Sequence, residues 1–307
     1  MQPVSPDASS VGPEANSETS ANIRTVRIGG DVSVELLDPA KKAPAGKGNE
    51  EFEEAGCSST GCALRLEVIH GPLPRLDDLE PVFDSTSLWK VFKQDGSHVF
   101  ELPHLRAVVD FESGSGRIYV EDGAAGLSAF DYPLDEVIFS RLLADKGSII
   151  VHACGIDYRG RGMLFCGASG AGKSTLADLF SDAEGAAVLS DDRVAAGIRD
   201  GSTLISGTPW HGTSGRGLNR TVPLERIFFL HHAPENRIEP VPASDAAARL
   251  ASLSVIPYWH AGSAKKALDA AVDMAGSVPA SSLGFVPGPT AVEICLDRVQ
   301  RPVSTIR

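Results

Sequence analysis

Alternating apolar and polar positions mark residues 22–130 of this chain. Short runs of this kind, separated by glycine-containing turns, are typical of strands joined in hairpins. The runs lie at residues 25–28, 32–36, 64–69, 89–92, 98–102, 105–111 and 117–120. They predict an antiparallel sheet, and therefore a small β-rich N-terminal region.

The pattern changes after residue 130, where strand-like and helix-like runs alternate. Pro133 stands where a helix can begin, and apolar residues at helical spacing follow as far as Leu142. Further strands are predicted at 148–153, 163–166, 186–190, 202–206 and 224–230, and further helices at 173–180, 244–253 and 264–274. This alternation predicts an α/β core over residues 131–307, with a mixed sheet flanked by helices.

Two segments contain little that a folded protein could bury. Residues 1–21 are rich in Ser, Pro, Glu and Asn, which predicts a disordered tail. Residues 39–60 are mainly Lys, Ala, Gly, Glu and Ser, and we expect a mobile loop that is long for a compact domain. The expected organisation is therefore a tail at 1–21, a β-rich region at 22–130 with a loop at 39–60, and an α/β domain at 131–307.

The composition is that of a soluble globular protein, with 42% apolar and 22% charged residues among 307. A net charge of −12 opposes binding to nucleic acid or to an anionic membrane, because both carry negative charge. The first residues have no basic segment followed by an apolar one, and no apolar run approaches the ~18 residues of a membrane span. We expect a cytoplasmic protein with neither a nucleic-acid nor a membrane partner.

The cysteines do not suggest a disulfide framework. There are five, at positions 57, 62, 154, 166 and 295, and both the odd count and the scattered spacing favour a reducing compartment. Cys57 and Cys62 are close enough in sequence for a metal or redox site. No second pair with zinc-site spacing lies nearby, so two ordinary loop thiols are the favoured interpretation.

The strongest chemical signal is a glycine-rich stretch that matches G-x-x-x-x-G-K-[ST], a phosphate-binding loop. It consists of Gly167, Ala168, Ser169, Gly170, Ala171, Gly172, Lys173, Ser174 and Thr175. Glycines allow backbone N–H groups to surround a phosphate, while Lys173 carries positive charge to the β- and γ-phosphates. The Ser174 hydroxyl is placed to bind Mg²⁺.

The residues around this stretch strengthen the interpretation. An apolar strand precedes the loop and a helix begins near Lys173, so the phosphate would lie at the positive end of a helix dipole. The alternative is a glycine-rich turn with a surface lysine, which does not account for both flanks. We therefore expect a nucleotide-binding protein.

Two further features could take part in chemistry with the nucleotide. A short apolar strand at 186–190 ends in Asp191 and Asp192, where one carboxylate could hold a metal ion and the other could accept a proton. His152, on a strand expected to neighbour the loop strand, could contact this pair. The alternatives are a surface turn for the aspartates and a hydrogen-bonded core residue for the histidine.

These residues together resemble the HPr kinase/phosphorylase family. The segments that carry the resemblance are residues 151–153, 162–176 and 189–192, and residues 208–212 and 223–230 are also similar. The resemblance covers roughly residues 148–232 firmly and the rest of the chain weakly. The nearer similarity is to shorter HPr-kinase-like proteins, some of which are found beside peptide-modification enzymes. The resemblance implies a P-loop kinase core, which is shared with ATP-dependent phosphoenolpyruvate carboxykinase, although the chain is short for the latter enzyme.

The resemblance also implies roles for individual residues. Asp191 would be the general base for a serine hydroxyl, Asp192 would assist with metal or phosphate, and His152 would bond within this cluster, but the division between the two aspartates stays open. Asp191, His152 and Lys173 are thus the candidate catalytic residues, and Ser174 and Asp192 the candidate metal ligands. The implied ligands are ATP and Mg²⁺, with a protein or peptide acceptor that carries a serine, and a homo-oligomer is possible.

One segment departs from the family pattern. The bifunctional enzymes carry E-[IV]-R-G-[LI]-G after the aspartates, whereas residues 213–218 keep only the Arg-Gly-Leu part of it. Phosphorylase activity is therefore not implied. Arg216 could stabilise transferred charge, but a solvated loop arginine is favoured, as packing is for Trp210 and a structural role for His211.

Three functions remain compatible with the sequence. The first is a Mg-ATP-dependent kinase for a hydroxyl, most simply a serine on a small protein or peptide. The second is a non-catalytic module that senses ATP and signals through the N-terminal region. The third is a kinase for a small metabolite on the same core.

Overall fold

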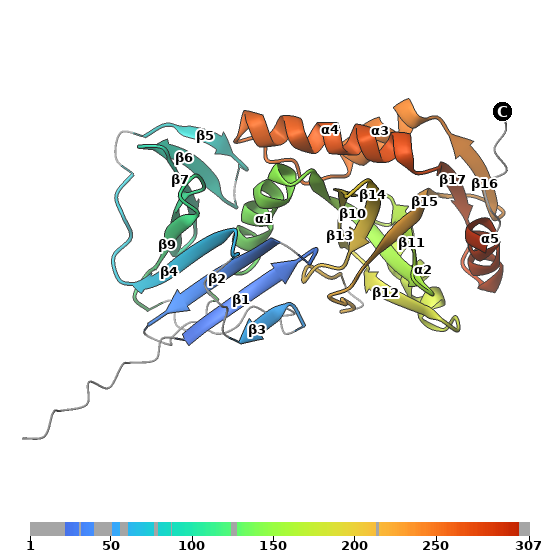
Figure 1. The fold of residues 1–307 in the computed structure, drawn as a ribbon, viewed down its shortest axis with the longest axis horizontal. Helices are drawn as coiled ribbons and strands as arrows, with labels where there is room; N and C mark the ends of the chain where they lie inside the picture. The colour runs from blue at the N-terminus through green and yellow to red at the C-terminus, as the bar shows by residue number, and fades with distance from the viewer. Residues whose placement is uncertain are drawn as a thin grey trace, which may run out of the picture.

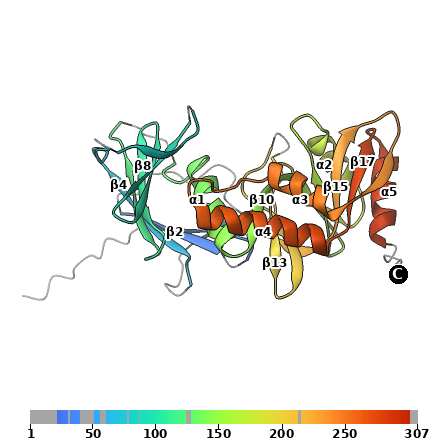
Figure 2. The same ribbon diagram turned by 90° about the horizontal axis from the view of Figure 1, so that it is seen from above.

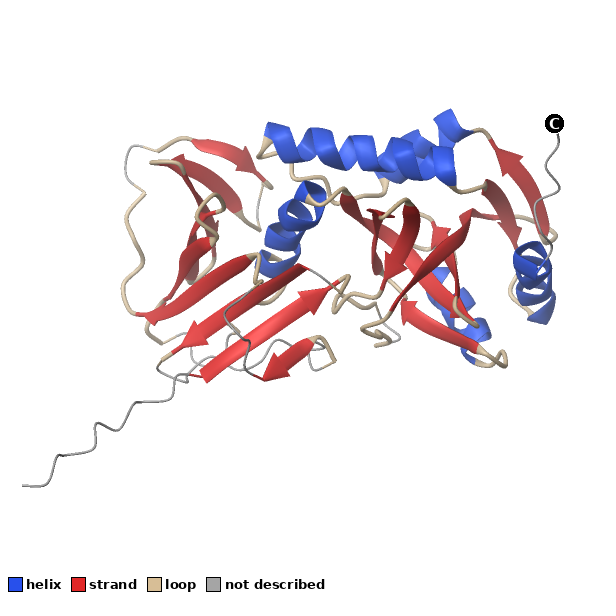
Figure 3. Cartoon of the chain, viewed as in Figure 1, coloured by secondary structure: helices blue, strands red, loops and turns tan. Residues whose placement is uncertain are grey.

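The computed structural model describes residues 22–30, 32–39, 51–55, 61–76, 79–86, 88–123, 128–212 and 215–300. The described chain is elongated, with one mixed sheet toward each end (Figure 1). Every helix within it begins after residue 130, so the first sheet is built from strands alone (Figure 3). The predicted tail at 1–21 lies outside the described residues.

The first sheet has the strand order β3-β1-β2-β4-β9-β8-β7-β6-β5. Its strands are β1 (Asn22–Ile28), β2 (Val32–Asp38), β3 (Glu53–Ala55), β4 (Leu64–His70), β5 (Pro81–Asp84), β6 (Lys90–Gln94), β7 (Ser97–Leu102), β8 (Leu105–Asp110) and β9 (Ser115–Val120). The predicted hairpins are present as β1–β2, β6–β7 and β8–β9. The prediction of a purely antiparallel sheet is wrong, because β4 pairs in parallel with both β2 and β9. Apolar alternation identifies the buried face of a strand but is the same for either pairing direction.

The predicted loop at 39–60 contains a strand. β3 pairs antiparallel with β1, and the carbonyl of Phe52 accepts a hydrogen bond of 2.9 Å from the Arg27 N–H. The Phe52 side chain is buried in the first core. The expectation of a continuous loop is therefore wrong over residues 52–55, since one aromatic side chain fixes this part to the sheet. Residues 40–50 and 56–60 lie outside the described residues.

The second sheet is mixed, as expected for this part of the chain. Its order is β11-β10-β13-β14-β15-β17-β16, with β12 paired to β10 and a further pairing of β11 with β15. Its strands are β10 (Ser148–Tyr158), β11 (Arg161–Cys166), β12 (Ala186–Ser190), β13 (Arg193–Arg199), β14 (Ser202–Ser206), β15 (Thr221–His232), β16 (Arg237–Val241) and β17 (Ala280–Phe285). The β11–β15 and β15–β17 pairings are parallel and bring the carboxyl ends of these three strands to one edge.

Helices accompany the second sheet. They are α1 (Leu134–Asp145), α2 (Lys173–Ser181), α3 (Ala243–Ser252), α4 (Ala261–Ser277) and α5 (Pro289–Gln300). α2 packs on β10 and β12, and α4 packs on α3, α1 and the second sheet. None of the described helices has both the length and the apolar character required to cross a bilayer.

Helix α1 connects the two halves of the molecule. Although it lies in the predicted 131–307 domain, its apolar residues are part of the core of the first sheet. It also contacts β10 and α4, and Figure 2 shows it beside α4 between the two sheets. The packing therefore continues across residue 131, where the sequence pattern changes.

Candidate functional site

The glycine-rich stretch connects β11 directly to α2. Gly170 and Gly172 have φ angles of +82° and +103°, which favour glycine. A Cβ on Gly172 would lie 2.7 Å from the Phe285 ring, and one on Gly167 would lie 2.8 Å from the Ala171 methyl group. Side chains at these two positions are thus excluded by space. The result is a tight turn with a helix N-terminus at its end, which is a suitable cradle for phosphate.

Lys173 folds back onto this turn. Its Nζ donates hydrogen bonds to the carbonyl of Gly167 at 2.7 Å and to that of Ala168 at 3.1 Å. Burial lowers the pKa of Lys173, while the Asp192 carboxylate opposes that effect. The ammonium group is thus held at the loop, within electrostatic reach of Asp192.

The other loop residues are more accessible. Ala168, Ser169, Gly170 and Thr175 are exposed, and Ser174 is partly buried in the first turn of α2. A hydroxyl at this place is available to a metal ion bound together with phosphate.

The side chain of Asp192 is 34% exposed and lies among cations. Its Oδ1 is 3.0 Å from His152 Nε2, and its Oδ2 is 3.1 Å from an Arg193 guanidinium nitrogen. Burial alone would raise the pKa of Asp192, but the hydrogen bond from His152 and the charges of Arg193 and Lys173 lower it overall. Asp192 is therefore held as a carboxylate between His152 and Arg193.

Asp191 is placed differently. Only 1% of it is exposed, and its Oδ1 accepts a 2.7 Å hydrogen bond from the Gly212 N–H. A Cβ on Gly212 would lie 2.9 Å from Asp191 Oδ2, so the loop backbone covers this carboxylate. The two consecutive aspartates thus have different surroundings. Asp191 is buried and holds the loop at Gly212, whereas Asp192 is accessible to solvent.

Strand β10 brings the glycine turn and the aspartates together, because Ala153 pairs with Cys166 just before the turn and its N–H donates to the Asp192 carbonyl at 3.1 Å. Burial raises the pKa of Cys154, Asp191 adds to this rise, and Lys173 and Arg216 oppose it. All three charges therefore act on one position in β10. Arg216 itself is ion-paired with Asp178 on α2.

The contacts of the remaining candidate residues indicate structural roles. Trp210 is buried and its Nε1 donates to Asp135 Oδ2 at 2.8 Å, which agrees with packing rather than base stacking. His211 is exposed, and its ring Nδ1 lies 3.4 Å from the Gly212 carbonyl oxygen. Cys154, Cys166 and Cys295 are buried thiols, Cys62 Sγ lies 4.0 Å from Glu35 Oε2, and Cys57 lies outside the described residues.

Sequence reasoning missed three residues at this site. Two of them are Arg193 and Glu136: Arg193 bridges Asp192 and Glu136, and Glu136 is far from the other two residues in the sequence. His232, at the carboxyl end of β15, has Nε2 3.0 Å from the Gly170 carbonyl oxygen. Only the His232 contact had a signal available: carboxyl ends of neighbouring parallel strands meet at one edge.

The described residues contain no cluster of three or more His, Cys, Asp or Glu side chains able to hold a metal ion alone. Mg²⁺ in nucleotide sites is held by one or two protein oxygens together with phosphate, so the Ser174 hydroxyl and the Asp192 carboxylate suffice as donors. The glycine turn is suited to phosphate as well, because residues 168–170 are exposed and the Lys173 ammonium is held at the carbonyls of Gly167 and Ala168. The residues present therefore fit Mg²⁺ bound with a nucleotide.

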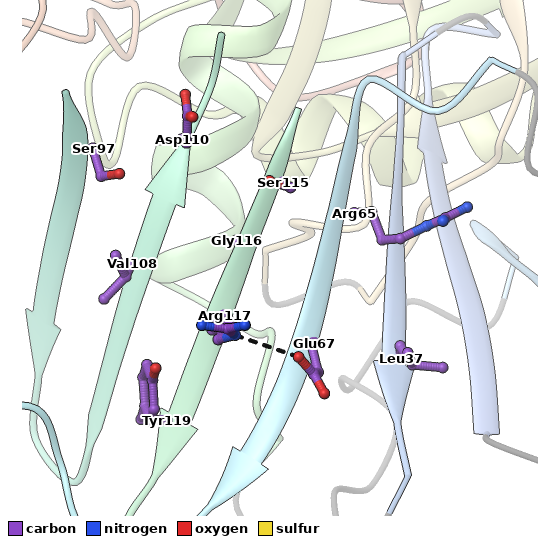
Figure 4. A pocket seen from close by; sticks show the side chains of 10 residues that line it. All are labelled: Leu37, Arg65, Glu67, Ser97, Val108, Asp110, Ser115, Gly116, Arg117 and Tyr119. Carbon is purple, nitrogen blue, oxygen red and sulfur yellow. Dashed lines mark hydrogen bonds and ion pairs between the residues drawn. The ribbon is translucent and has the colours of Figure 1, made fainter. Parts of the chain in front are cut away.

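A separate groove of about 500 Å³ lies on the first sheet, and no predicted site residue lines it (Figure 4). Its arginines are paired: Arg117 Nε is 3.4 Å from Glu67, and Arg65 Nε is 2.5 Å from Glu35. Paired charges leave this surface without an evident ligand.

Comparisons with known proteins give two similarities. Residues 135–284, slightly less than half of the chain, match the family model for SynChlorMet cassette protein ScmC. The structure is similar to the Hpr(Ser) kinase/phosphatase from Coxiella burnetii at 11% identity, covering 47% of this chain and 90% of that one, with a TM-score of 0.27. That similarity is too distant to carry an argument. No curated protein matches the chain.

Proposed function

We propose that this protein is a Mg-ATP-dependent kinase that transfers the γ-phosphoryl group to a hydroxyl, most simply a serine on a small protein or peptide. One observation carries the proposal: the glycine turn that holds Lys173 and the half-buried Asp192 lie beside the same residue of β10, because Ala153 pairs with Cys166 just before the turn and its N–H donates to the Asp192 carbonyl at 3.1 Å. A phosphate donor and a proton acceptor could therefore occupy the same small region.

Binding would begin at the turn. Backbone N–H groups of Gly167–Lys173 and the N-terminus of α2 would receive the phosphates. Lys173 would exchange its contacts with the carbonyls of Gly167 and Ala168 for contacts with phosphate oxygens. Mg²⁺, held with Ser174, would supply charge neutralisation on the β- and γ-oxygens.

The acceptor proton would go to Asp192. As the acceptor oxygen forms its bond to the γ-phosphorus, the bond to the β–γ bridging oxygen breaks and its electron pair leaves with ADP. The hydroxyl proton passes to an Asp192 oxygen, while His152 holds the carboxylate in place from Oδ1. The resemblance favours Asp191 as the base, but its burial and its bond to Gly212 support the neighbouring residue.

The test compares both aspartates. We expect Asp192→Asn to lower phosphate transfer at least about 100-fold while the Kd for Mg-ATP changes far less, because the Asn side chain keeps an oxygen for Mg²⁺ but cannot accept the proton. Lys173→Ala should weaken Mg-ATP binding itself. Transfer from labelled ATP is measured on a degenerate peptide library with a fixed Ser, Thr or Tyr, and binding by calorimetry.

Asp191→Asn is the informative comparison. It keeps an oxygen for the Gly212 N–H, so we expect a smaller loss of transfer than in Asp192→Asn. If Asp192→Asn transferred phosphate at the parental rate, or if Asp191→Asn alone abolished transfer, the assignment of the base would be wrong.

The ATP-sensing alternative keeps one supporting observation. Glu136, on the helix that packs in the first core, is bonded directly to Arg193 beside the site. A sensor would bind Mg-ATP tightly yet give no phosphate transfer to any library peptide, whereas a kinase would give both.

A further inference from the structure

Two adjacent carboxylates in the first turn of α1 are buried without a role in binding or transfer. Asp135 is 1% exposed and Glu136 is 6% exposed. Burying charged groups is costly unless each has a partner, so their contacts should explain why they are present. Glu136 leads to Asp192 through Arg193, and Asp135 leads to Asp191 through the loop that contains Trp210 and Gly212.

The path from Glu136 is a chain of ion pairs. Glu136 Oε1 accepts a 2.7 Å hydrogen bond from Arg193 Nε, and Arg193 also contacts Asp192 Oδ2 at 3.1 Å. The guanidinium is thus shared between two carboxylates, and Glu136 fixes its orientation. Loss of Glu136 would free Arg193 to change its position relative to Asp192.

The path from Asp135 passes through a loop. Asp135 Oδ2 accepts from Trp210 Nε1 at 2.8 Å, and Trp210 is two residues from Gly212. The Gly212 N–H in turn donates to Asp191 Oδ1 at 2.7 Å. Asp135 therefore anchors the loop that covers Asp191.

Both paths start from helix α1, which contacts β10 and α4 and also packs into the core of the first sheet. Leu134, Val137 and Ile138 of α1 are buried in the core of the first sheet. A shift of that sheet would carry the first turn of α1, and with it Arg193 and Trp210. The site is thus tied to the N-terminal region by two independent polar contacts.

We propose that Asp135 and Glu136 are positioning residues that hold the loop over Asp191 and the guanidinium beside Asp192, and that they thereby couple the β-rich N-terminal region to the phosphate site. The effect on transfer rests on the proposed kinase function. The geometric link itself does not, because it exists without nucleotide.

The first experiment tests only the structural contacts that start from Asp135 and Glu136, without any measurement of phosphate transfer. In the ¹⁵N-labelled full chain without nucleotide, Asp135→Leu should move the Gly212 amide resonance, and Glu136→Leu should move the Arg193 Nε–H resonance. Asp135→Asn and Glu136→Gln keep an acceptor oxygen, so the Gly212 and Arg193 resonances should lie close to their positions in the parent chain. Glu67→Gln, which alters an exposed ion pair on the first sheet, is the control and should move neither. Unmoved Gly212 and Arg193 resonances in the leucine variants would overturn the proposal.

The second experiment reads the consequence for transfer. We expect both leucine variants to keep the parental Kd for Mg-ATP within about threefold and to lose at least about tenfold in kcat on the peptide library. Conservative variants should recover most of that loss. Equal losses in binding and transfer would indicate general damage and overturn the positioning role.

The two proposals fail separately. If the resonances move as expected but the parent chain transfers no phosphate, the kinase function is wrong and the positioning link stands. If the parent transfers phosphate and the leucine variants do so at its rate, the coupling is wrong and the kinase stands.

Discussion

Two buried titratable residues give stability opposite dependences on pH. Burial and the neighbouring Arg141 lower the pKa of His98 to about 4, from 6.5. Between these values the unfolded chain binds more protons, so this contribution is present above pH 6.5 and is lost as the pH falls. Burial raises the pKa of Asp135 from 3.8 to about 7, so the folded chain binds more protons and stability falls as the pH rises.

Substituting either residue should reveal the effect of the other one on the pH dependence of stability. In Asp135→Asn we expect the free energy of unfolding to decrease when the pH falls from 6 to 5, because His98 binds a proton in the unfolded chain and stays neutral in the folded one. In His98→Leu it should increase over the same interval. Each slope approaches about 1.4 kcal/mol per pH unit, relative to groups common to all variants. Urea denaturation at the two pH values measures both.

The double variant is the control, and its slope should lie between those of the single variants. Equal slopes in Asp135→Asn and His98→Leu would show that the two groups do not oppose each other.

Single residues also show where the sequence stops being informative. The spacing of the loop motif identifies Lys173 without a structure, because the motif is local. It does not decide between Asp191 and Asp192, since consecutive residues after a strand face opposite sides and only the surroundings tell which side is open. Glu136 could not be found at all, because its partner Arg193 is 57 residues away.

At the scale of elements, the glycine turn depends on the end of β17. Gly172 starts α2 with φ +103°, and its Cα faces the ring of Phe285. Gly172→Ala should cost about 1–3 kcal/mol through overlap with the ring, and should weaken Mg-ATP binding because the turn is displaced. Urea unfolding and calorimetric titration measure the two effects.

A double-mutant cycle separates overlap from backbone strain. In a Phe285→Leu background the cost of Gly172→Ala should fall by more than ~0.5 kcal/mol, because the clashing ring atoms are gone. Gly170→Ala is the matched control: its φ is also positive, but no atom lies within 4 Å of the added Cβ. If Gly172→Ala cost no more than Gly170→Ala, the contact with Phe285 would be unimportant.

Some elements carried too little pattern to be predicted. β17 is Ala-Ser-Ser-Leu-Gly-Phe, with small polar residues where a buried strand normally has branched apolar ones. It is held by parallel pairing to β15 and antiparallel pairing to β16, which are contacts that no local window contains. β13, β16 and α5 were missed too, while the strand–loop–helix order around the phosphate loop was predicted because each part has its own local signal.

At the scale of the whole molecule, the change of pattern near residue 131 does not coincide with a break in packing. The core around the first sheet includes Phe139 of α1, and also Trp210 and Trp259 from much later in the chain. The division into 22–130 and 131–307 describes two kinds of secondary structure. Packing that continues from one to the other could not be predicted from periodicity, which reports only which face of an element is buried.

This continuity predicts that the two halves unfold together. Phe100 is buried in the core of the first sheet and Phe165 in a core of the second sheet, while Phe139 of α1 contacts Trp210 with ring centroids 5.9 Å apart. In the full chain carrying 4-fluorophenylalanine, the ¹⁹F signals of Phe100 and Phe165 should disappear at the same urea concentration. Phe139→Ala, at a fully buried position, should lower the unfolding free energy by about 3–5 kcal/mol and move both midpoints equally. Tyr258→Ala, at a 64% exposed position, is the matched control and should move neither. A midpoint for Phe100 that shifts without that of Phe165 would mean that the first sheet unfolds alone, and that α1 is then too weak a connection to carry the coupling between the N-terminal region and the glycine turn.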